Sequence, residues 1–401
     1  MTNDASDRPA VRLTPKTSAK AIRFGAPWAW SDQIVLDRRT RAIPAGAIVE
    51  LQDSGRQSLG AAAFNPASKI AARMLDRDPA AVIDGDWFKA RIARALDLRE
   101  TLFDAPFYRL IHAEADDMPG VIVDRFGDAA VIQPNAAWIE TRLDDFAAAL
   151  SSVTGVTSIV KNGSGRARAL EGLTEETILL TGALDGPVPV PMNGATYMAD
   201  LIGGQKTGLF FDQRPNHAFA ARLSRGRDVL DVFCHVGGFG LAALADGAKT
   251  ALGIDGSQTA LDLADEGAKA TGVADRFETR KADAFYALAE LATRDRRFGM
   301  VVCDPPAFAP NRQALDAGLR AYERVSRLGA ALVEPGGFLT LCSCSHAVDL
   351  AAFREASLRG VGRAGRSARI VATGGAGPDH PVHPYLAETS YLKTVFLRLD
   401  A

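Results

Sequence analysis

The chain has few cysteines, no long apolar run and no excess of charge of one sign. Its 401 residues include only 4 cysteines, with neither a secreted disulfide pattern nor paired C-x-x-C spacing, so we expect a reducing compartment and no metal site. No apolar stretch is long enough to span a bilayer, and residues 1–10 carry no apolar signal-peptide core. These absences predict a cytoplasmic protein without a membrane partner.

The formal net charge of −2 excludes a protein that coats nucleic acid non-specifically, because that function needs a broad excess of Lys and Arg. Any nucleic-acid site must therefore be local. Residues 1–73 hold 11 Lys and Arg against 6 Asp and Glu, a modest basic bias. Charge alone favours a solvated surface over an RNA-binding face for this segment.

The length exceeds that of one hydrophobic core and predicts two or three domains. Residues 10–78 contain short strands broken by Pro and Gly, which predicts a small β-barrel. Residues 79–188 are mixed α+β, with a helical run near 87–104. Residues 189–401 alternate apolar strands with helices, the pattern of a parallel, doubly wound, Rossmann-like α/β sheet. The Gly/Ala/Arg-rich stretch at 359–377 is expected to be loop.

Polar residues end the strands of this third segment, where ligands bind in a doubly wound sheet. The first strand leads into D-V-F-C-H-V-G-G-F-G, so Asp231 and the turn glycines Gly237 and Gly238 are predicted cofactor-binding residues. Asp255 ends the second strand and could accept both hydroxyls of an adenosine ribose. Asp283 follows the third strand and could either receive the adenine amino group or cap a helix. A ribose-binding acid suits NAD and S-adenosylmethionine equally.

The fourth strand ends V-V-C-D-P-P-A-F and separates these two cofactors. Pro305 and Pro306 fix the backbone and hold Asp304 and the ring of Phe308 at the sheet edge, so all four are predicted to bind the target base. Methyltransferases acting on nitrogen or on a base use such an element, whereas dehydrogenases do not. A last strand after 368–372 would complete the terminal hairpin typical of methyltransferase sheets. We therefore predict S-adenosylmethionine as the cofactor.

The fifth strand ends G-F-L-T-L-C-S-C-S-H and carries two cysteines. Their spacing of two places Cys342 and Cys344 on one face of a strand. Two thiols buried in the core would show the same spacing, so a structural role for both is the alternative. Cys344 is closer to the strand end, with Ser343 beside it as a substrate-binding residue. His346 and His380 could assist as bases, although each is more often a surface or capping residue.

A thiolate at this place indicates one particular chemistry. Carbon 5 of cytosine is too poor a nucleophile to attack a sulfonium methyl group, so an enzyme must first add a thiolate at carbon 6. Cys344 is the predicted nucleophile, and Asp304 could hydrogen-bond the amino edge of the cytosine. Because a thiol with a pKa of about 8.5 is barely ionised at neutral pH, the site should supply positive charge or a helix N-terminus that lowers this pKa.

Motifs along nearly the whole chain carry a family resemblance. They are R-F-G-A-P-W-A-W-S from Arg23, F-N-P-A-S-K-I from Phe64, Y-R-L-I-H-A-E-A-D-D-M-P-G-V-I-V-D-R-F-G from Tyr108, Q-K-T-G-L-F-F-D-Q-R from Gln205, D-P-P from Asp304, S-C-S around Cys344 and D-H-P-V from Asp379. Together they resemble the bacterial large-subunit ribosomal RNA cytosine-5 methyltransferases, which have an N-terminal PUA domain and a central EEHEAD domain.

The resemblance implies a PUA-like RNA-binding barrel at 10–78, an EEHEAD-like domain at 79–188 and a methyltransferase domain at 189–401. It implies 5-methylcytosine in ribosomal RNA, with 23S RNA expected, made through a covalent adduct with Cys344. The cofactor elements of the family fall on Lys206, Asp212, Gln213, Arg214, the glycine turn 237–238, Asp255, Asp283 and Asp304. The chain has C-H-V-G-G-F where relatives often have S-Y-T-G-G-F, so His235 could alter cofactor contacts, and the family pattern gives Cys342 no role.

Other functions remain open at this stage. A methyltransferase of the same architecture could act on another base atom, such as a guanine nitrogen, for which no thiolate is needed. A non-catalytic RNA-binding or ribosome-assembly factor could keep the same fold. A nicotinamide-dependent oxidoreductase would leave D-P-P and S-C-S unexplained. The sequence also leaves open the nucleotide, naked RNA against an assembling subunit as the partner, and whether the protein is a homodimer.

Overall fold

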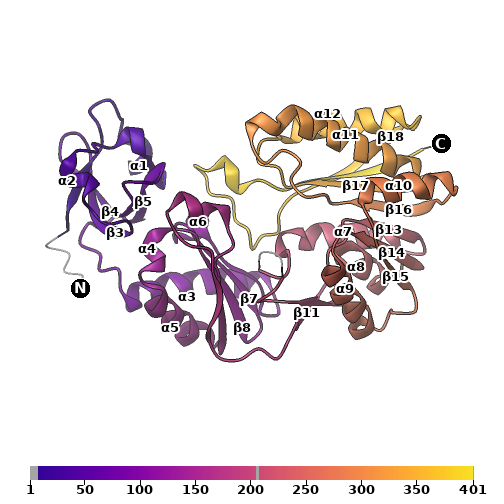
Figure 1. Ribbon diagram of the computed structural model, residues 1–401, viewed down its shortest axis with the longest axis horizontal. Coiled ribbons are helices and arrows are strands. Elements are labelled where there is room, and N and C mark those ends of the chain that lie inside the picture. Colours follow the sequence, from indigo (N-terminus) through magenta and orange to yellow (C-terminus); the bar gives the residue numbers. More distant parts are fainter. Residues whose placement is uncertain (1–7, 205–206, 401) are drawn as a thin grey trace. The chain divides into compact units, whose positions relative to one another are not determined.

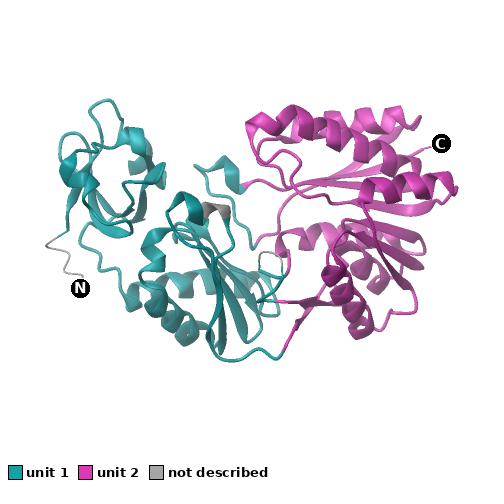
Figure 2. Ribbon diagram, viewed as in Figure 1, with its two compact units in different colours: residues 1–185, 201–208, 379–389 teal, residues 186–200, 209–378, 390–401 magenta. Residues whose placement is uncertain are grey.

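The computed structural model describes residues 8–204 and 207–400, which divide into two compact units (Figures 1 and 2). Unit 1 comprises residues 1–185, 201–208 and 379–389, and unit 2 comprises residues 186–200, 209–378 and 390–401. The chain therefore passes from one unit to the other after residues 185, 200, 208, 378 and 389. No helix within the described ranges is both long enough and apolar enough to cross a membrane.

The N-terminal part of unit 1 is a small β-domain. Among its described residues, a five-stranded sheet has the order β1-β3-β4-β5-β2, in which only β1 and β3 pair in parallel. Its strands are β1 Ala10–Arg12, β2 Trp28–Trp30, β3 Ala47–Gln52, β4 Ser58–Phe64 and β5 Ile70–Asp76, with the short helices α1 Lys20–Arg23 and α2 Arg38–Arg41. Val11, Leu51 and Phe64 are buried inside it. This confirms the predicted small β-domain.

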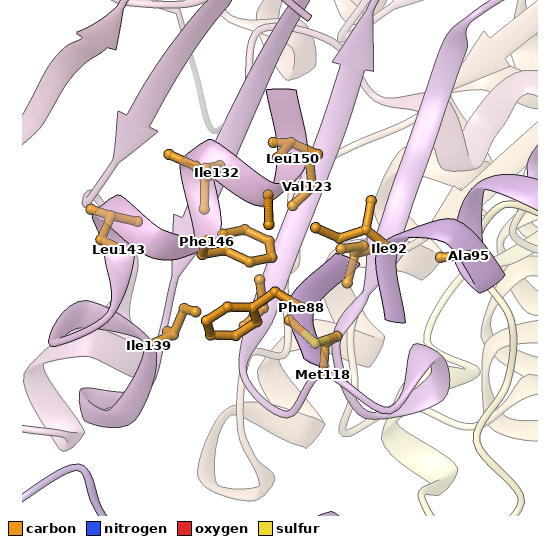
Figure 3. Packing of buried hydrophobic residues seen from close by; sticks show 14 of the residues in the cluster. Phe88, Ile92, Ala95, Met118, Val123, Ile132, Ile139, Leu143, Phe146 and Leu150 are labelled. Carbon is orange, nitrogen blue, oxygen red and sulfur yellow. The ribbon is translucent and has the colours of Figure 1, made fainter. Parts of the chain in front are cut away.

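The second part of unit 1 is an α+β domain, as predicted. Its strands have the order β10-β9-β8-β7-β6. They are β6 Phe107–His112, β7 Val121–Phe126, β8 Ala129–Pro134, β9 Ser158–Asn162 and β10 Thr177–Thr181, and the helices are α3 Gly85–Leu102, α4 Ala137–Glu140, α5 Leu143–Thr154 and α6 Arg166–Leu170. Asp84 starts α3 by accepting bonds from the Asp86 and Trp87 amides. Phe88 of α3 and Phe146 of α5 pack against each other in the core (Figure 3).

Unit 2 contains the predicted doubly wound sheet. Among its described residues, seven strands have the order β15-β14-β13-β16-β17-β19-β18, with β13 to β17 parallel and β19 antiparallel to both neighbours. They are β13 Asp228–Val232, β14 Thr250–Asp255, β15 Phe277–Lys281, β16 Phe298–Cys303, β17 Val333–Ser343, β18 Ala368–Gly374 and β19 Lys393–Leu399. The terminal hairpin expected after 368–372 is therefore confirmed.

Helix α7 precedes the sheet strands of unit 2, other helices connect or follow them, and a separate hairpin comes before α7. The helices are α7 Arg214–Ser224, α8 Gly238–Ala245, α9 Gln258–Thr271, α10 Ala284–Thr293, α11 Leu315–Ala331 and α12 Leu350–Arg363. The hairpin consists of β11 Val188–Met192 and β12 Ala195–Ala199. The hydroxyl of Tyr197 donates to the carbonyl of Gly238 at 3.0 Å, so the hairpin supports the start of α8. The three-domain boundaries at 78 and 188 remain a prediction.

The expectation of a loop at 359–377 is wrong, because this stretch contains the end of α12 and all of β18. Glycine disfavours helices in general, but here it serves helix packing. A Cβ atom on Gly360 would lie 2.7 Å from the Cβ of Ser326 and closer still to the carbonyl of Glu323, both on α11. The glycine therefore permits a close approach of α12 to α11, which composition alone does not reveal.

Candidate functional site

Four neighbouring parallel strands of unit 2 end at one edge of the sheet, and they bring together most of the predicted site. Asp255 is the last residue of β14, Asp304 directly follows β16, and Cys344 directly follows β17. The turn after β13 lies between the ends of β14 and β16. Ligands bind at this edge in doubly wound sheets, so the predicted residues meet where the fold places its site.

The turn after β13 has a strained backbone. Phe233 and His235 have positive φ angles of 63° and 50°, and Gly237 has a φ of 83°. Such conformations cost about 1–3 kcal/mol in a non-glycine residue and cluster at functional sites. Asp255 holds the turn, because its carboxylate accepts the amide of His235 at 3.0 Å and that of Ser257 at 2.9 Å. The residue pattern of this turn did not predict the strain.

Gly238 has a different role from the one expected. The prediction was that both turn glycines let the backbone approach a ligand. A Cβ on Gly238 would instead lie 2.9 Å from the ring of His217, a buried residue of α7. Gly237 needs glycine for its left-handed backbone, whereas Gly238 needs it for packing against α7. Cofactor contact at either glycine stays a prediction.

Asp231 lies within β13 and is fully buried. Its Oδ2 accepts the amide of Gly240 at 2.8 Å, while its Oδ1 has no hydrogen-bond partner. Burial raises the pKa of Asp231 to about 7, against the bonds from the Gly240 and Phe239 amides. Near neutral pH this side chain therefore offers an acceptor that the protein itself leaves unsatisfied.

A second buried carboxylate begins the D-Q-R motif. Oδ2 of Asp212 accepts the hydroxyl of Tyr391, and its Oδ1 has no partner. Gln213 donates to Asp304 at 2.8 Å and is itself held by Asn216, whose amide donates to it at 2.7 Å. The motif is thus fixed to the carboxyl end of β16.

The predicted cofactor set has three further members, Arg214, Lys206 and Asp283. The guanidinium of Arg214, the first residue of α7, lies 5.5 Å from the ring centre of Phe211. Lys206 lies outside the described residues. Asp283 caps α10, with its carboxylate accepting the amide of Tyr286 at 2.9 Å. The helix-capping alternative for Asp283 is therefore realised, and its contact with adenine remains a prediction.

These residues fit S-adenosylmethionine. The unpartnered oxygens of Asp212 and Asp231 are buried acceptors, and a buried acceptor without a donor is costly. A ligand that carries an ammonium group and ribose hydroxyls supplies donors, and its positive charge suits carboxylates. Asp255 keeps further acceptor positions, since each carboxylate oxygen can accept about two bonds.

The two cysteines of the fifth strand have different environments. Cys342 is buried within β17 and accepts the hydroxyl of Thr394 at 3.4 Å, and burial raises its pKa well above the ordinary value. Cys344 lies just beyond the strand and is partly exposed. Cys234 and Cys303 are buried too, and burial raises the pKa of each. Cys344 is thus the accessible thiol among the four, and Cys342 is a core residue.

The residues on both sides of Cys344 are clamped. Ser343 donates to the hydroxyl of Tyr322 at 2.9 Å, and that hydroxyl lies 2.7 Å from the Oγ of Ser345. Ser345 also accepts the amide of Ala309 at 3.0 Å. All three hydroxyl-bearing residues are buried. Ser343 therefore holds the nucleophile loop, and its predicted contact with substrate is untested.

The D-P-P loop is tied to the same network through Ala309. Pro305 is buried, Pro306 is exposed, and Phe308 is partly buried with its ring 5.0 Å from that of Tyr322. The loop that should hold the target base and the loop that carries Cys344 thus share Tyr322 as a support. A change in one loop should be felt in the other.

The two candidate bases belong to different units. His346 is exposed in unit 2, and its ring lies 5.4 Å from that of Tyr391. His380 is buried in unit 1, where its Nδ1 lies 3.0 Å from the Asp379 carboxylate and its ring 4.9 Å from that of His112. His380 is therefore part of a packed core, which disfavours it as a base.

Residue-level reasoning missed Tyr391 and Lys393. Both belong to Y-L-K, directly before or at the start of β19. Because β19 runs antiparallel to β17, its first residues lie at the edge where the parallel strands end. A signal existed, since the predicted terminal hairpin already implied this direction.

The strand order, the antiparallel β19 and the acid-lined sheet edge define a class I S-adenosylmethionine-dependent methyltransferase. A family model described as S-adenosylmethionine-dependent methyltransferase matches residues 179–386, and a model of a PUA-like domain matches residues 11–77. The cofactor is S-adenosylmethionine.

The chain belongs to the ribosomal RNA large subunit methyltransferase I family. It is 34% identical to the protein of that name from Photobacterium profundum, over 94% of this chain and 96% of that one. The Tolumonas auensis protein is also 34% identical, over 96% and 98%. A methyltransferase solved in complex with S-adenosylhomocysteine shares the fold, with a TM-score of 0.81 and 18% identity over 97% of this chain and 99% of that one.

Proposed function

We propose that the protein methylates carbon 5 of a cytosine in large-subunit ribosomal RNA through a covalent adduct between Cys344 and carbon 6. The observation that carries this proposal is the contrast between Cys344, partly exposed at the cofactor edge, and the buried Cys342 two residues earlier. The names of the relatives support ribosomal RNA as the substrate, and the PUA-like domain is consistent with RNA binding.

Each residue has a defined part in this reaction. The Cys344 thiolate bonds to carbon 6, and the ring electrons then make carbon 5 nucleophilic. S-adenosylmethionine, when bound, supplies an electrophilic methyl group on its sulfonium. Once carbon 5 carries the methyl group, a base removes the proton from that carbon, and the bond between carbon 6 and the Cys344 sulfur breaks to restore the aromatic ring and the Cys344 thiolate. In this proposal Asp304, which accepts a hydrogen bond from Gln213, accepts another from the exocyclic amino group of the base.

The test compares two cysteines in one assay. Purified protein is incubated with methyl-labelled S-adenosylmethionine and 23S RNA from a strain that lacks the gene, and nucleosides are identified by mass spectrometry. Native protein and Cys342→Ala should yield 5-methylcytidine, whereas Cys344→Ala should yield none while still binding S-adenosylhomocysteine. Label on guanosine would favour methylation of another base atom, and no label from the native protein would favour a non-catalytic role.

A further inference from the structure

Lys393 is a buried lysine, and no carboxylate among the described residues forms an ion pair with it. Its side chain is only 8% exposed, and it opens β19 directly opposite Ser343 of β17. Its Nζ donates to the carbonyls of Ser345 at 2.7 Å and Val348 at 2.8 Å. A buried lysine is expensive unless it has a function or a partner.

Both acceptors lie in the loop that carries Cys344. Two elements therefore bind this loop. Lys393 of β19 binds its backbone carbonyls, and the hydroxyl of Tyr322 on α11 is hydrogen-bonded to Ser343 and Ser345. An ammonium has three donors, and the two carbonyls use two of them. The remaining donor and the positive charge are available to a neighbouring anion.

Charged groups around Lys393 define what that anion can be. When ionised, Cys344 and Asp349, the residue that caps α12, each raise the pKa of Lys393. Burial lowers the pKa of Lys393, and these two groups oppose the shift. Burial raises the pKa of the Tyr322 hydroxyl, and an ionised Cys344 raises it further, so this hydroxyl stays neutral at ordinary pH.

We propose that Lys393 is the positioning residue that activates Cys344, its buried ammonium stabilising the thiolate that adds to the base. This inference rests on the proposed function, in which Cys344 is the nucleophile. The sulfur needs nearby positive charge to ionise at neutral pH. Lys393 supplies that charge from a restrained position. Its backbone is paired in β19, and its Nζ is hydrogen-bonded to two carbonyls of the loop.

The experiment measures the ionisation of Cys344 without RNA or cofactor. The full-length protein is alkylated with iodoacetamide between pH 5.5 and 10, and the rate at Cys344 is followed by peptide mass spectrometry. The native inflection should fall below the ordinary thiol value of about 8.5. In Lys393→Met it should rise by at least one pH unit, with roughly a tenfold lower rate at pH 7 and the native rate recovered at pH 10.

Several outcomes overturn the proposal. A native inflection at or above about 8.5 does so whether or not the variant folds, and so does an unchanged inflection in Lys393→Met. Unfolding of the variant is recognised by alkylation of the buried Cys303 and Cys342. Failure of the proposed function is separate, because it appears as absent 5-methylcytidine from native protein whose Cys344 inflection is low.

Discussion

Both units bury charged side chains, but the hydrogen bonding of these side chains differs between the two units. In unit 1 the fully buried Arg99 donates to both oxygens of Asp116, each at 2.7 Å, and to the carbonyls of Arg109 and Asp379. In unit 2 the buried Asp212 and Asp231 each keep one oxygen without a partner. A buried charge whose hydrogen bonds are all made stabilises the fold, whereas one with an unpartnered oxygen is a candidate ligand-binding group.

The largest effect should come from breaking the satisfied cluster. Arg99→Leu leaves Asp116 buried without its counter-charge and should lower the free energy of unfolding by about 3–5 kcal/mol in urea titrations. Arg94→Leu is the matched control, because Arg94 pairs with Asp117 at the surface and should cost less than about 1 kcal/mol. Equal costs for the two variants would contradict the structural role of the cluster.

Asp231→Asn tests a buried carboxylate with an unpartnered oxygen through the pH dependence of the unfolding free energy. The folded pKa of about 7 lies above the ordinary 3.8, so the stability that Asp231 contributes is present below pH 3.8 and is lost as pH rises through about 7. Asparagine cannot ionise. Without cofactor, the unfolding free energy of the variant relative to the native protein should rise by up to about 1.4 kcal/mol per pH unit between pH 4 and 7. A pH-independent difference in urea titrations would be inconsistent with an ionising Asp231.

Asp212→Asn should affect ligand binding more than stability. Loss of the carboxylate removes an acceptor for a cationic ligand, and calorimetry should show about tenfold weaker binding of S-adenosylhomocysteine. Tyr391→Phe keeps the carboxylate and should bind within about twofold of the native protein, because only the supporting hydroxyl is lost. Native affinity in Asp212→Asn would remove this residue from the cofactor site.

The smallest effect is expected at Cys342. Cys342→Ala removes a buried sulfur and should lower the free energy of unfolding by about 1 kcal/mol through the small cavity left behind. Its methylation rate should stay at the native value, since Cys342 is a buried residue of β17 that accepts the hydroxyl of Thr394. A lost activity with an unchanged melting temperature would show that the second cysteine acts in the chemistry.

The fold of unit 2 was predictable because four of its five parallel strands, β13, β14, β16 and β17, are mainly apolar runs, a local signal that the polar β15 lacks. Asp255, Asp304 and Cys344 were found for the same reason. The C-terminal end of α12 was missed, because Gly360 packs against Glu323 and Ser326 of α11, which lie far away in sequence. Local sequence patterns therefore predict where strands end, but they do not predict features that depend on tertiary packing.

Contacts made across long stretches of sequence explain the other misses. Lys393 meets the nucleophile loop only because β19 inserts between β17 and β18. His380, a candidate base from sequence, belongs instead to the cluster of unit 1, where Arg109 donates its amide to Asp379. The positions of Lys393 and His380 cannot be predicted from any periodic pattern in the sequence. The resemblance to a family supplied Asp212 and Gln213, which residue patterns alone did not.

The repeated passage of the chain between units has a consequence for protein synthesis. Arg99 and Arg109 belong to the first 185 residues, yet their cluster needs Asp379, which the ribosome adds far later. Until Asp379 is synthesised, Arg99 and Arg109 of the nascent chain therefore lack their hydrogen bonds to it. Expressing residues 1–185 alone should give a weakened domain, and fusing the segment 379–389 to it should restore resistance to protease.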